Sequence, residues 1–126
     1  MPMRSEFDTT RRVVLTFGTG EITDDELKDH HVAMFGDPAF DPGFDQLADF
    51  RGAIPRVSSE TVRMIARRSR FASEARRAFV VSSEVAFGLG RMFELSLGAE
   101  AETVRLFEDI DEARAWLGLT PSSSAL

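Results

Sequence analysis

Residues 47–68 read LADFRGAIPRVSSETVRMIARR, and this stretch decides the fold. Its start is apolar, which predicts a short, central, buried strand over Gln46–Phe50. A loop that contains Pro55 follows, and the pair Ser58 and Ser59 then precedes a run of apolar residues at helical spacing. Serine is among the preferred residues at helix N-termini, so one of the two serines is expected to begin a helix. The stretch is typical of a strand–loop–helix unit.

The same rhythm of strand and helix recurs on both sides of this unit. Strands are predicted over Met3–Phe7, Arg11–Phe17, Arg77–Ser82 and Thr103–Phe107, and helices over Thr23–Gly36, Val85–Leu97 and the EARAWL segment between its cap (Asp109 or Asp111) and Gly118. Thr23 and Glu26 have the spacing of a capping box, and a turn is expected between Gly18 and Gly20, with a short strand after it. Strands separated by helices require crossover connections, so only the opening pair is expected to be antiparallel. We predict an α/β fold, a single-layer mixed, mostly parallel sheet of four or five strands with helices packed on it.

The length and composition limit the classes of protein that the chain can represent. Its 126 residues fit one domain, which we expect over residues 1–118, with a flexible tail over residues 119–126. The absence of cysteine excludes disulfides, thiolate metal sites and thiol catalysis. The N-terminus lacks the apolar run of a signal peptide, and no stretch approaches the roughly 20 apolar residues of a membrane span. We therefore expect a cytoplasmic protein.

The charge is unevenly distributed. A net charge of −6 argues against nonspecific binding to nucleic acid. Between residues 63 and 77, however, there are six arginines and one acidic residue. Arg63, Arg67 and Arg70 line one face of the predicted helix. This face could hold an acidic partner segment, a phosphoryl group or an anionic lipid head, and the alternative is a solvated face that covers the edge of the core.

Four local patterns point to a family of known fold. They are GEIT at Gly20–Thr23, DPAFDPGF at Asp37–Phe44 leading into LADFR at Leu47–Arg51, AFGLGRMF at Ala86–Phe93, and RLFEDIDEARAWL at Arg105–Leu117. In this order and spacing they resemble the SpoIIAA-like family, related in fold to the STAS domains of anti-sigma-factor antagonists and to lipid-binding CRAL-TRIO domains. The resemblance covers residues 11–117. It implies a non-enzymatic regulatory module that acts through a protein partner and needs no cofactor.

The resemblance also implies where such a partner would bind. In STAS domains of the antagonist type, a partner kinase phosphorylates a serine at a helix start, and Ser59 falls at that position here. Ser58 stands where that motif has aspartate, and Thr61 stands where it has glycine. Phosphorylation of Ser59 and ordinary capping by the two serines are therefore both open. The implied partner-binding residues are Ser58, Ser59, Arg63 and Arg67.

The predicted helix over Val85–Leu97 carries more large apolar residues than one inward stripe can hold. They are either buried between the sheet and a neighbouring helix, or they serve self-association as a homodimer, or they line the pocket of a small apolar or lipid-like ligand. The CRAL-TRIO resemblance suggests the ligand, and the candidate pocket residues are Phe87, Met92, Phe93 and Phe107.

No residue pattern indicates a metal site or a catalytic centre. His30 and His31 are adjacent, so on a helix their side chains point about 100° apart and do not converge on one ion. The repeated aspartates Asp37, Asp41 and Asp45 are explained by Asx-type turns beside proline and glycine. There is no G-x-S-x-G elbow, no P-loop and no G-x-G-x-x-G after a strand. We predict no catalytic residue, no metal and no cofactor.

Overall fold

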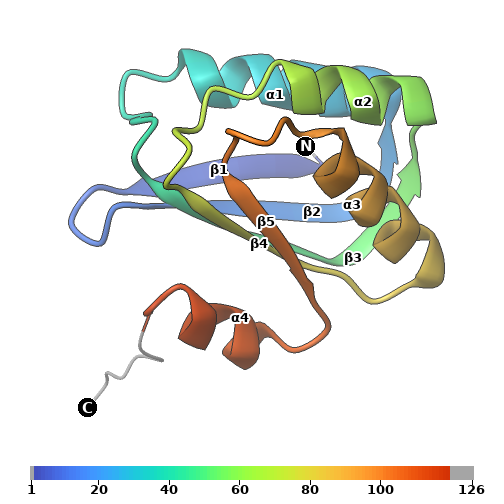
Figure 1. Ribbon diagram of the computed structural model, residues 1–126. Helices are drawn as coiled ribbons and strands as arrows, with labels where there is room; N and C mark the ends of the chain where they lie inside the picture. Colours follow the sequence, from blue (N-terminus) through green and yellow to red (C-terminus); the bar gives the residue numbers. More distant parts are fainter. Residues whose placement is uncertain (1, 120–126) are drawn as a thin grey trace.

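The computed structural model describes residues 2–119 and contains a five-stranded sheet covered by helices on both faces (Figure 1). The elements are, in chain order, β1 Met3–Asp8, β2 Val13–Thr23, α1 Asp24–Gly36, β3 Asp45–Arg56, α2 Ser59–Arg67, β4 Arg76–Val80, α3 Glu84–Ser96, β5 Thr103–Phe107 and α4 Ile110–Trp116. The strand order is β1-β2-β3-β4-β5, with β1 antiparallel to β2 and the other pairs parallel. The predicted α/β fold with a mostly parallel sheet is confirmed, and β3 is its central strand.

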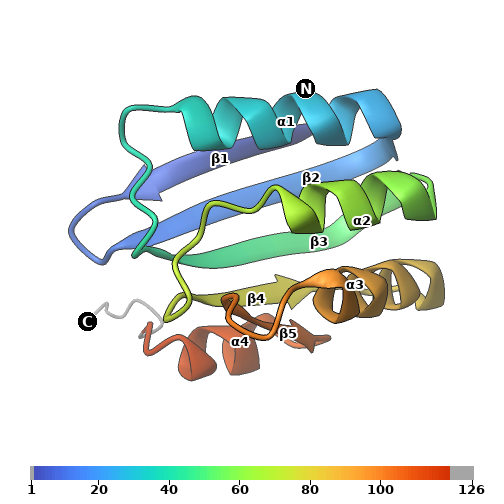
Figure 2. The ribbon, with the colours of Figure 1, turned by 45° about the horizontal axis from the view of Figure 1, so that its top comes forward.

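The consecutive strand order explains the arrangement of the helices. From β2 to β5 each parallel strand lies beside the one before it, and α1, α2 and α3 form the three connections. Crossover connections of this kind are right-handed, so three steps in the same direction place all three helices on one face of the sheet. Figure 2 shows α1, α2 and α3 side by side over this face, while α4 packs on the opposite face.

The core is divided by the sheet into two layers. On the α4 side, Val13, Leu47, Ala78, Val80 and Phe107 of the strands pack against Ala113 and Leu117. On the α1–α3 side, Ala48, Phe79 and Val104 pack against Val62, Ile65 and Phe93. Successive residues of a strand point to opposite faces, which is why Phe79 and Val80 belong to different layers.

β2 departs from the prediction at its glycines. The turn expected between Gly18 and Gly20 is wrong, because β2 continues through both to Thr23 and shifts its register with β3 between Phe17 and Thr19. Gly18 is buried, and a Cβ atom there would lie 2.7 Å from Cδ1 of Phe50. Gly20 has φ +69, a backbone conformation that glycine adopts without strain. The two glycines thus allow an irregular strand and a close ring contact.

β3 is also longer than predicted. The expected loop that contains Pro55 is wrong, because the strand runs to Arg56 and Pro55 lies opposite Ile22 of β2. β4 pairs only with residues 46–49 of β3, so the second half of β3 has a strand neighbour on the β2 side alone. Proline in a strand is found mainly at such edge positions, where its missing N–H can face away from the ladder.

The helix boundaries agree well with the predicted capping residues. Thr23 Oγ1 accepts the N–H of Glu26 at 3.3 Å, and Glu26 Oε1 accepts the N–H of Thr23 at 2.9 Å, which completes the capping box. Asp109 caps α4. Leu119, the first residue of the predicted tail, is buried against the α4 layer, and the rest of that tail lies outside the described residues. None of the helices in residues 2–119 has the length and apolar character needed to cross a membrane.

Candidate functional site

The start of α2 holds both predicted serines. Ser58 is the N-cap: its Oγ accepts the N–H of Thr61 at 3.2 Å, and its own N–H donates to Asp24 Oδ1 at 2.7 Å. The bond from the Ser58 backbone lowers the pKa of the Asp24 carboxyl. Ser59 is the first helical residue, its side chain is partly exposed, and Arg63 Nη2 donates to its Oγ at 3.4 Å. The cap is therefore Ser58, and Ser59 lies beside an arginine.

The arginines of α2 and of the segment after it form an exposed basic surface. We call Arg63, Arg67, Arg68 and Arg70 the α2 arginines; all four are exposed. Within residues 2–119, none of them has a carboxylate oxygen within 4.0 Å, whereas Arg51, Arg56 and Arg76 each pair with an acidic side chain. Of the four predicted partner-binding residues, Ser58 is the N-cap of α2, and Ser59, Arg63 and Arg67 lie on the helix itself. Arg63 and Arg67 belong to the α2 arginines.

The four predicted pocket residues are not brought together. Phe93 is buried between α3 and the sheet, and Met92 is partly buried in the same layer, where Arg63 Nη1 lies 3.9 Å from its Sδ. Phe87 is 42% exposed. Phe107 lies on the other face of the sheet, with its ring centroid 5.7 Å from that of Trp116 of α4. A single pocket lined by these four residues is wrong, because the sheet separates Phe107 from α3.

The excess of apolar residues on α3 is resolved in two ways. Phe93 is buried, and Leu89, Met92 and Leu97 pack around the cluster that contains it. Val85 and Leu95 are 61% and 75% exposed. The helix therefore buries one stripe and leaves isolated apolar side chains in solvent.

A cavity that the sequence did not reveal lies between the sheet and α1–α3. Its volume is about 140 Å³. Most of its lining is apolar and includes Phe50, Phe79, Phe93, Leu27, Leu89 and Val62. Its polar lining comprises Thr16, Gln46, Arg77 and the two histidines, His30 and His31. The available signal was three polar side chains, Thr16, Gln46 and Arg77, each two positions from an apolar residue that faces the helices from the same strand (Val14, Ala48 and Phe79).

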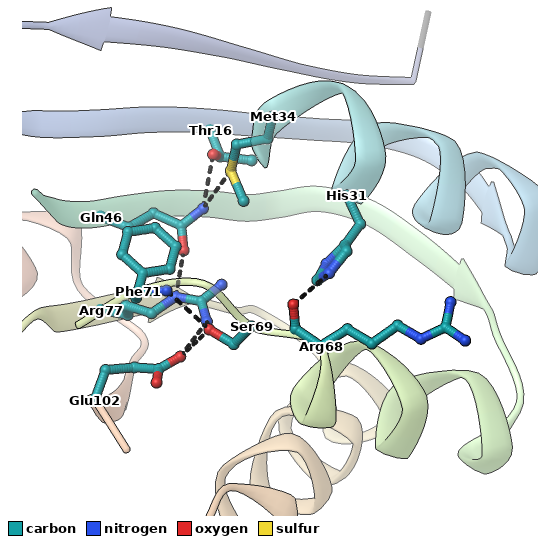
Figure 3. Close-up of polar contacts among 9 residues, drawn as sticks. All are labelled: Thr16, His31, Met34, Gln46, Arg68, Ser69, Phe71, Arg77 and Glu102. Atoms are coloured by element: carbon teal, nitrogen blue, oxygen red, sulfur yellow. Dashed lines mark hydrogen bonds and ion pairs between the residues drawn. The ribbon is translucent and has the colours of Figure 1, made fainter. Parts of the chain in front are cut away.

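Arg77 is the centre of a buried hydrogen-bond network (Figure 3). The residue is 5% exposed; its Nε donates to Gln46 Oε1 at 2.8 Å and its Nη1 to Glu102 Oε2 at 2.9 Å. Ser69 Oγ donates to the same Glu102 oxygen. Gln46 Nε2 donates in turn to Thr16 Oγ1 at 2.8 Å. The network ties β2, β3 and β4 to the segments that precede β4 and β5.

The charge of Arg77 is retained despite this burial. Desolvation lowers its pKa to about 10, and the Glu102 carboxylate acts in the opposite direction. Phe71, Phe79 and Phe93 surround the guanidinium, with Cζ at 4.3, 5.4 and 5.0 Å from their ring centroids. Arg77 is therefore a cation at neutral pH, held by one carboxylate and by aromatic faces.

The two histidines at the cavity are neutral at pH 7. Burial lowers the pKa of His31 to about 4 and also lowers the pKa of His30. His31 Nε2 lies 3.4 Å from the carbonyl oxygen of Arg68, which can only accept, so this nitrogen carries the proton. His30 Nε2 lies 2.7 Å from Ser5 Oγ. In the described part of the chain, no group of three histidine or acidic side chains is placed to hold a metal ion.

Two of the three repeated aspartates, Asp37 and Asp41, have the local role expected for Asx turns, whereas the prediction is wrong for Asp45, the first residue of β3. Asp37 Oδ1 accepts the N–H of Ala39 at 2.8 Å, and Asp41 Oδ1 accepts the N–H of Gly43 at 2.8 Å. Asp45 instead pairs with Arg76 of β4.

Comparisons with known proteins identify the fold. No protein-family model and no curated protein matches the chain. Among solved structures, the chain is similar to an uncharacterized protein from the DUF3478 family with a SpoIIAA-like fold, from Shewanella loihica PV-4. The similarity covers 91% of this chain and 93% of that chain, with a TM-score of 0.60 and 14% sequence identity. The predicted SpoIIAA-like fold is confirmed, and an identity this low carries information on the fold alone.

Proposed function

We propose that the protein is a non-enzymatic regulatory module that binds an acidic segment of a protein partner through α2. Ser58, Ser59, Arg63 and Arg67 would form the contact. The observation that carries this proposal is the set of α2 arginines, four exposed cations without a carboxylate partner in residues 2–119. In a protein of net charge −6, such a local excess of positive charge favours an acidic partner and steers its approach.

Phosphorylation of Ser59 would regulate this contact. A phosphate adds a charge of about −1.5 to −2 at neutral pH, and it is favoured at a helix N-terminus. Ser59 Oγ already lies 3.4 Å from Arg63 Nη2, so a phosphate there would occupy Arg63 and repel an acidic segment. We therefore propose that the unmodified protein is the form that binds.

The other expectations remain predictions of lower rank. A pocket for an apolar ligand lined by Phe87, Met92, Phe93 and Phe107 is not favoured, because these residues lie on both faces of the sheet. Self-association through α3 would have to use the exposed Val85, Phe87 and Leu95. The cytoplasmic location also stays a prediction.

The test is to identify the partner and then to reverse the charge of the α2 arginines. Partners are crosslinked in cells of the source organism, and binding is measured with the purified partner for the wild type and for Arg63→Glu/Arg67→Glu. We expect the double variant to lose at least about tenfold in affinity, because like charges facing each other across an interface are costly. The matched control is Arg105→Glu, another exposed arginine without a carboxylate partner among the described residues, but on β5. Equal affinity of the double variant and the wild type would reject the α2 surface.

A second measurement separates capping from regulation. Ser59→Asp should lower the affinity for the partner. Ser59→Ala should bind the partner like the wild type, because the hydroxyl itself makes only the 3.4 Å contact with Arg63. If both variants bind like the wild type, Ser59 has no regulatory role and the partner surface stands without it.

A further inference from the structure

We infer that the cavity beneath α1–α3 is a binding site for a small, uncharged, largely apolar molecule that carries one hydrogen-bond acceptor, such as a carbonyl oxygen. The cavity shares no lining residue with the proposed partner contact of Ser58, Ser59, Arg63 and Arg67. The two sites can therefore be tested independently.

The size and lining of the cavity define the apolar part of the ligand. Native cores leave few voids larger than a water molecule, and this one measures about 140 Å³. An engineered apolar cavity of about 150 Å³ stays dry and binds benzene, which sets the scale. Because most of the lining side chains are apolar, and three of them are phenylalanines, the ligand's body is a ring or a branched chain of that size.

A hydrogen-bond donor of Arg77 that has no partner in the protein defines the polar part of the ligand. Nε and Nη1 are bonded to Gln46, Glu102 and Ser69, whereas Nη2 makes no hydrogen bond to any described residue, and one guanidinium nitrogen has no dashed line in Figure 3. Every fully enclosed side-chain nitrogen and oxygen of residues 2–119 has a partner. Nη2 is therefore not enclosed by protein atoms, and the space that Arg77 lines is the cavity. Since Arg77 is 5% exposed, an acceptor inside the cavity would satisfy this donor away from bulk water.

The charges around the cavity select an uncharged acceptor. The positive charge of Arg77 is already matched by Glu102 at 2.9 Å. The other polar groups of the lining are neutral, since Thr16 and Gln46 do not ionise and both histidines are deprotonated at pH 7. A carboxylate ligand would add a buried charge without a counterion, which is costly, whereas a carbonyl oxygen adds a hydrogen bond and no charge.

The edge of the sheet provides the entrance. Phe50, Ala53 and Pro55 are partly exposed lining residues at the carboxyl end of β3, where β4 no longer pairs with it. Leu89 and Gly90 of α3 line the same cavity and are also partly exposed, whereas Gln46 and Arg77, near the amino ends of β3 and β4, are buried. A ligand that enters between these partly exposed residues would meet the buried polar groups with its acceptor first.

Three probes that share a six-membered carbon ring test the inference by NMR titration: cyclohexanone, methylcyclohexane and cyclohexanecarboxylate. We expect saturable shifts for the methyl groups of Met34, Val62 and Ala86, which line the cavity, and a dissociation constant for cyclohexanone at least tenfold below those of the other two. Equal affinity for methylcyclohexane would overturn the acceptor requirement, and tighter binding of the carboxylate would overturn the neutral site. No saturable shift with any probe would overturn the site itself.

Matched variants locate the binding. Ala53→Phe places a ring at the entrance and should abolish cyclohexanone binding, whereas Ala115→Phe, a change at an exposed alanine of α4 on the other face, should leave it unchanged. Arg77→Met/Glu102→Gln removes the donor together with its counterion and should reduce the preference for cyclohexanone over methylcyclohexane to about twofold or less. If Arg77→Met/Glu102→Gln does not fold, the comparison of Ala53→Phe with Ala115→Phe still tests whether the probe binds in the cavity. Binding that survives Ala53→Phe contradicts the inference, and Arg63→Glu/Arg67→Glu should bind the probe like the wild type.

Discussion

Two groups of arginines, fewer than fifteen residues apart in the sequence, have opposite environments. The α2 arginines are exposed and have no acidic partner in the described residues, whereas Arg77 is buried, ion-paired with Glu102 and surrounded by three phenylalanine rings. The exposed set can exchange its counterions for a partner's carboxylates, while Arg77 cannot release Glu102 without leaving a charge inside the protein. The first group is suited to reversible recognition and the second to holding the walls of the cavity.

The largest expected effect comes from breaking the buried pair. Arg77→Met leaves Glu102 buried without a counterion, and breaking such a pair by removing one partner costs about 3–5 kcal/mol. Arg63→Met should change the free energy of unfolding by less than about 0.5 kcal/mol, because exposed charges contribute little. Chemical denaturation of the two variants measures this difference.

The double variant Arg77→Met/Glu102→Gln is the control for this prediction. It removes both charges, so it should recover most of the stability that Arg77→Met alone loses. If the single and double variants are equally unstable, the cost arises from the lost packing of the guanidinium against Phe71 and Phe93 and not from the unpaired carboxylate.

The contrast between the two groups also shows what the sequence could reveal. Periodicity located the helices and most strands, and the capping residues fixed the start of α1 and narrowed the cap of α4 to Asp109 or Asp111, because these signals are local. Position 77 was assigned correctly to a strand. Its partner Glu102, however, lies 25 residues further along the chain, and no local pattern connects the two. The buried network and the cavity therefore required the tertiary structure.

The errors have a common physical origin. Gly18, Gly20 and Pro55 are turn-forming residues by local propensity, yet they lie inside β2 and β3. Pairing with neighbouring strands outweighs that propensity, and the free edge of β3 removes the usual penalty for proline. Likewise, the predicted pocket combined Phe107 with Phe93 of α3, whereas side chains alternate between the two faces along β5 and that of Phe107 points to the α4 side.

A smaller change in stability is expected at the N-terminal cap of α2, the helix that carries exposed arginines. Ser58→Ala removes the acceptor of the Thr61 N–H and should lower the free energy of unfolding by about 1 kcal/mol. Ser59→Ala should cost less than about 0.5 kcal/mol, because Ser59 caps no backbone group. Thermal or urea denaturation distinguishes the two, and a larger cost for Ser59→Ala would contradict the assignment of Ser58 as the cap.

The smallest expected effect concerns a second cation near Arg77. The folded protein holds His31 neutral with its pKa lowered from 6.5 to about 4, mainly by burial, with Arg77, Arg68 and His30 nearby. In the unfolded chain His31 takes up a proton near pH 6.5, so the unfolded state binds more protons as the pH falls from about 6.5 to 4. The stability that the neutral imidazole provides is present above pH 6.5 and is lost through this window. Because the ring is partly exposed, solvent screens the effect and keeps it small.

His31→Gln isolates this contribution. The variant cannot titrate at that position, so its midpoint of urea denaturation should fall less than that of the wild type between pH 7 and pH 4.5. Hydrogen bonds to each carboxylate lower the pKa values of Asp8, Asp24 and Asp49, and these carboxyls affect the stability of both proteins alike. If the urea midpoints of the two proteins fall in parallel as the pH is lowered, the interior near Arg77 accepts a second positive charge. The argument that the cavity selects an uncharged ligand would then hold only above the pKa of His31.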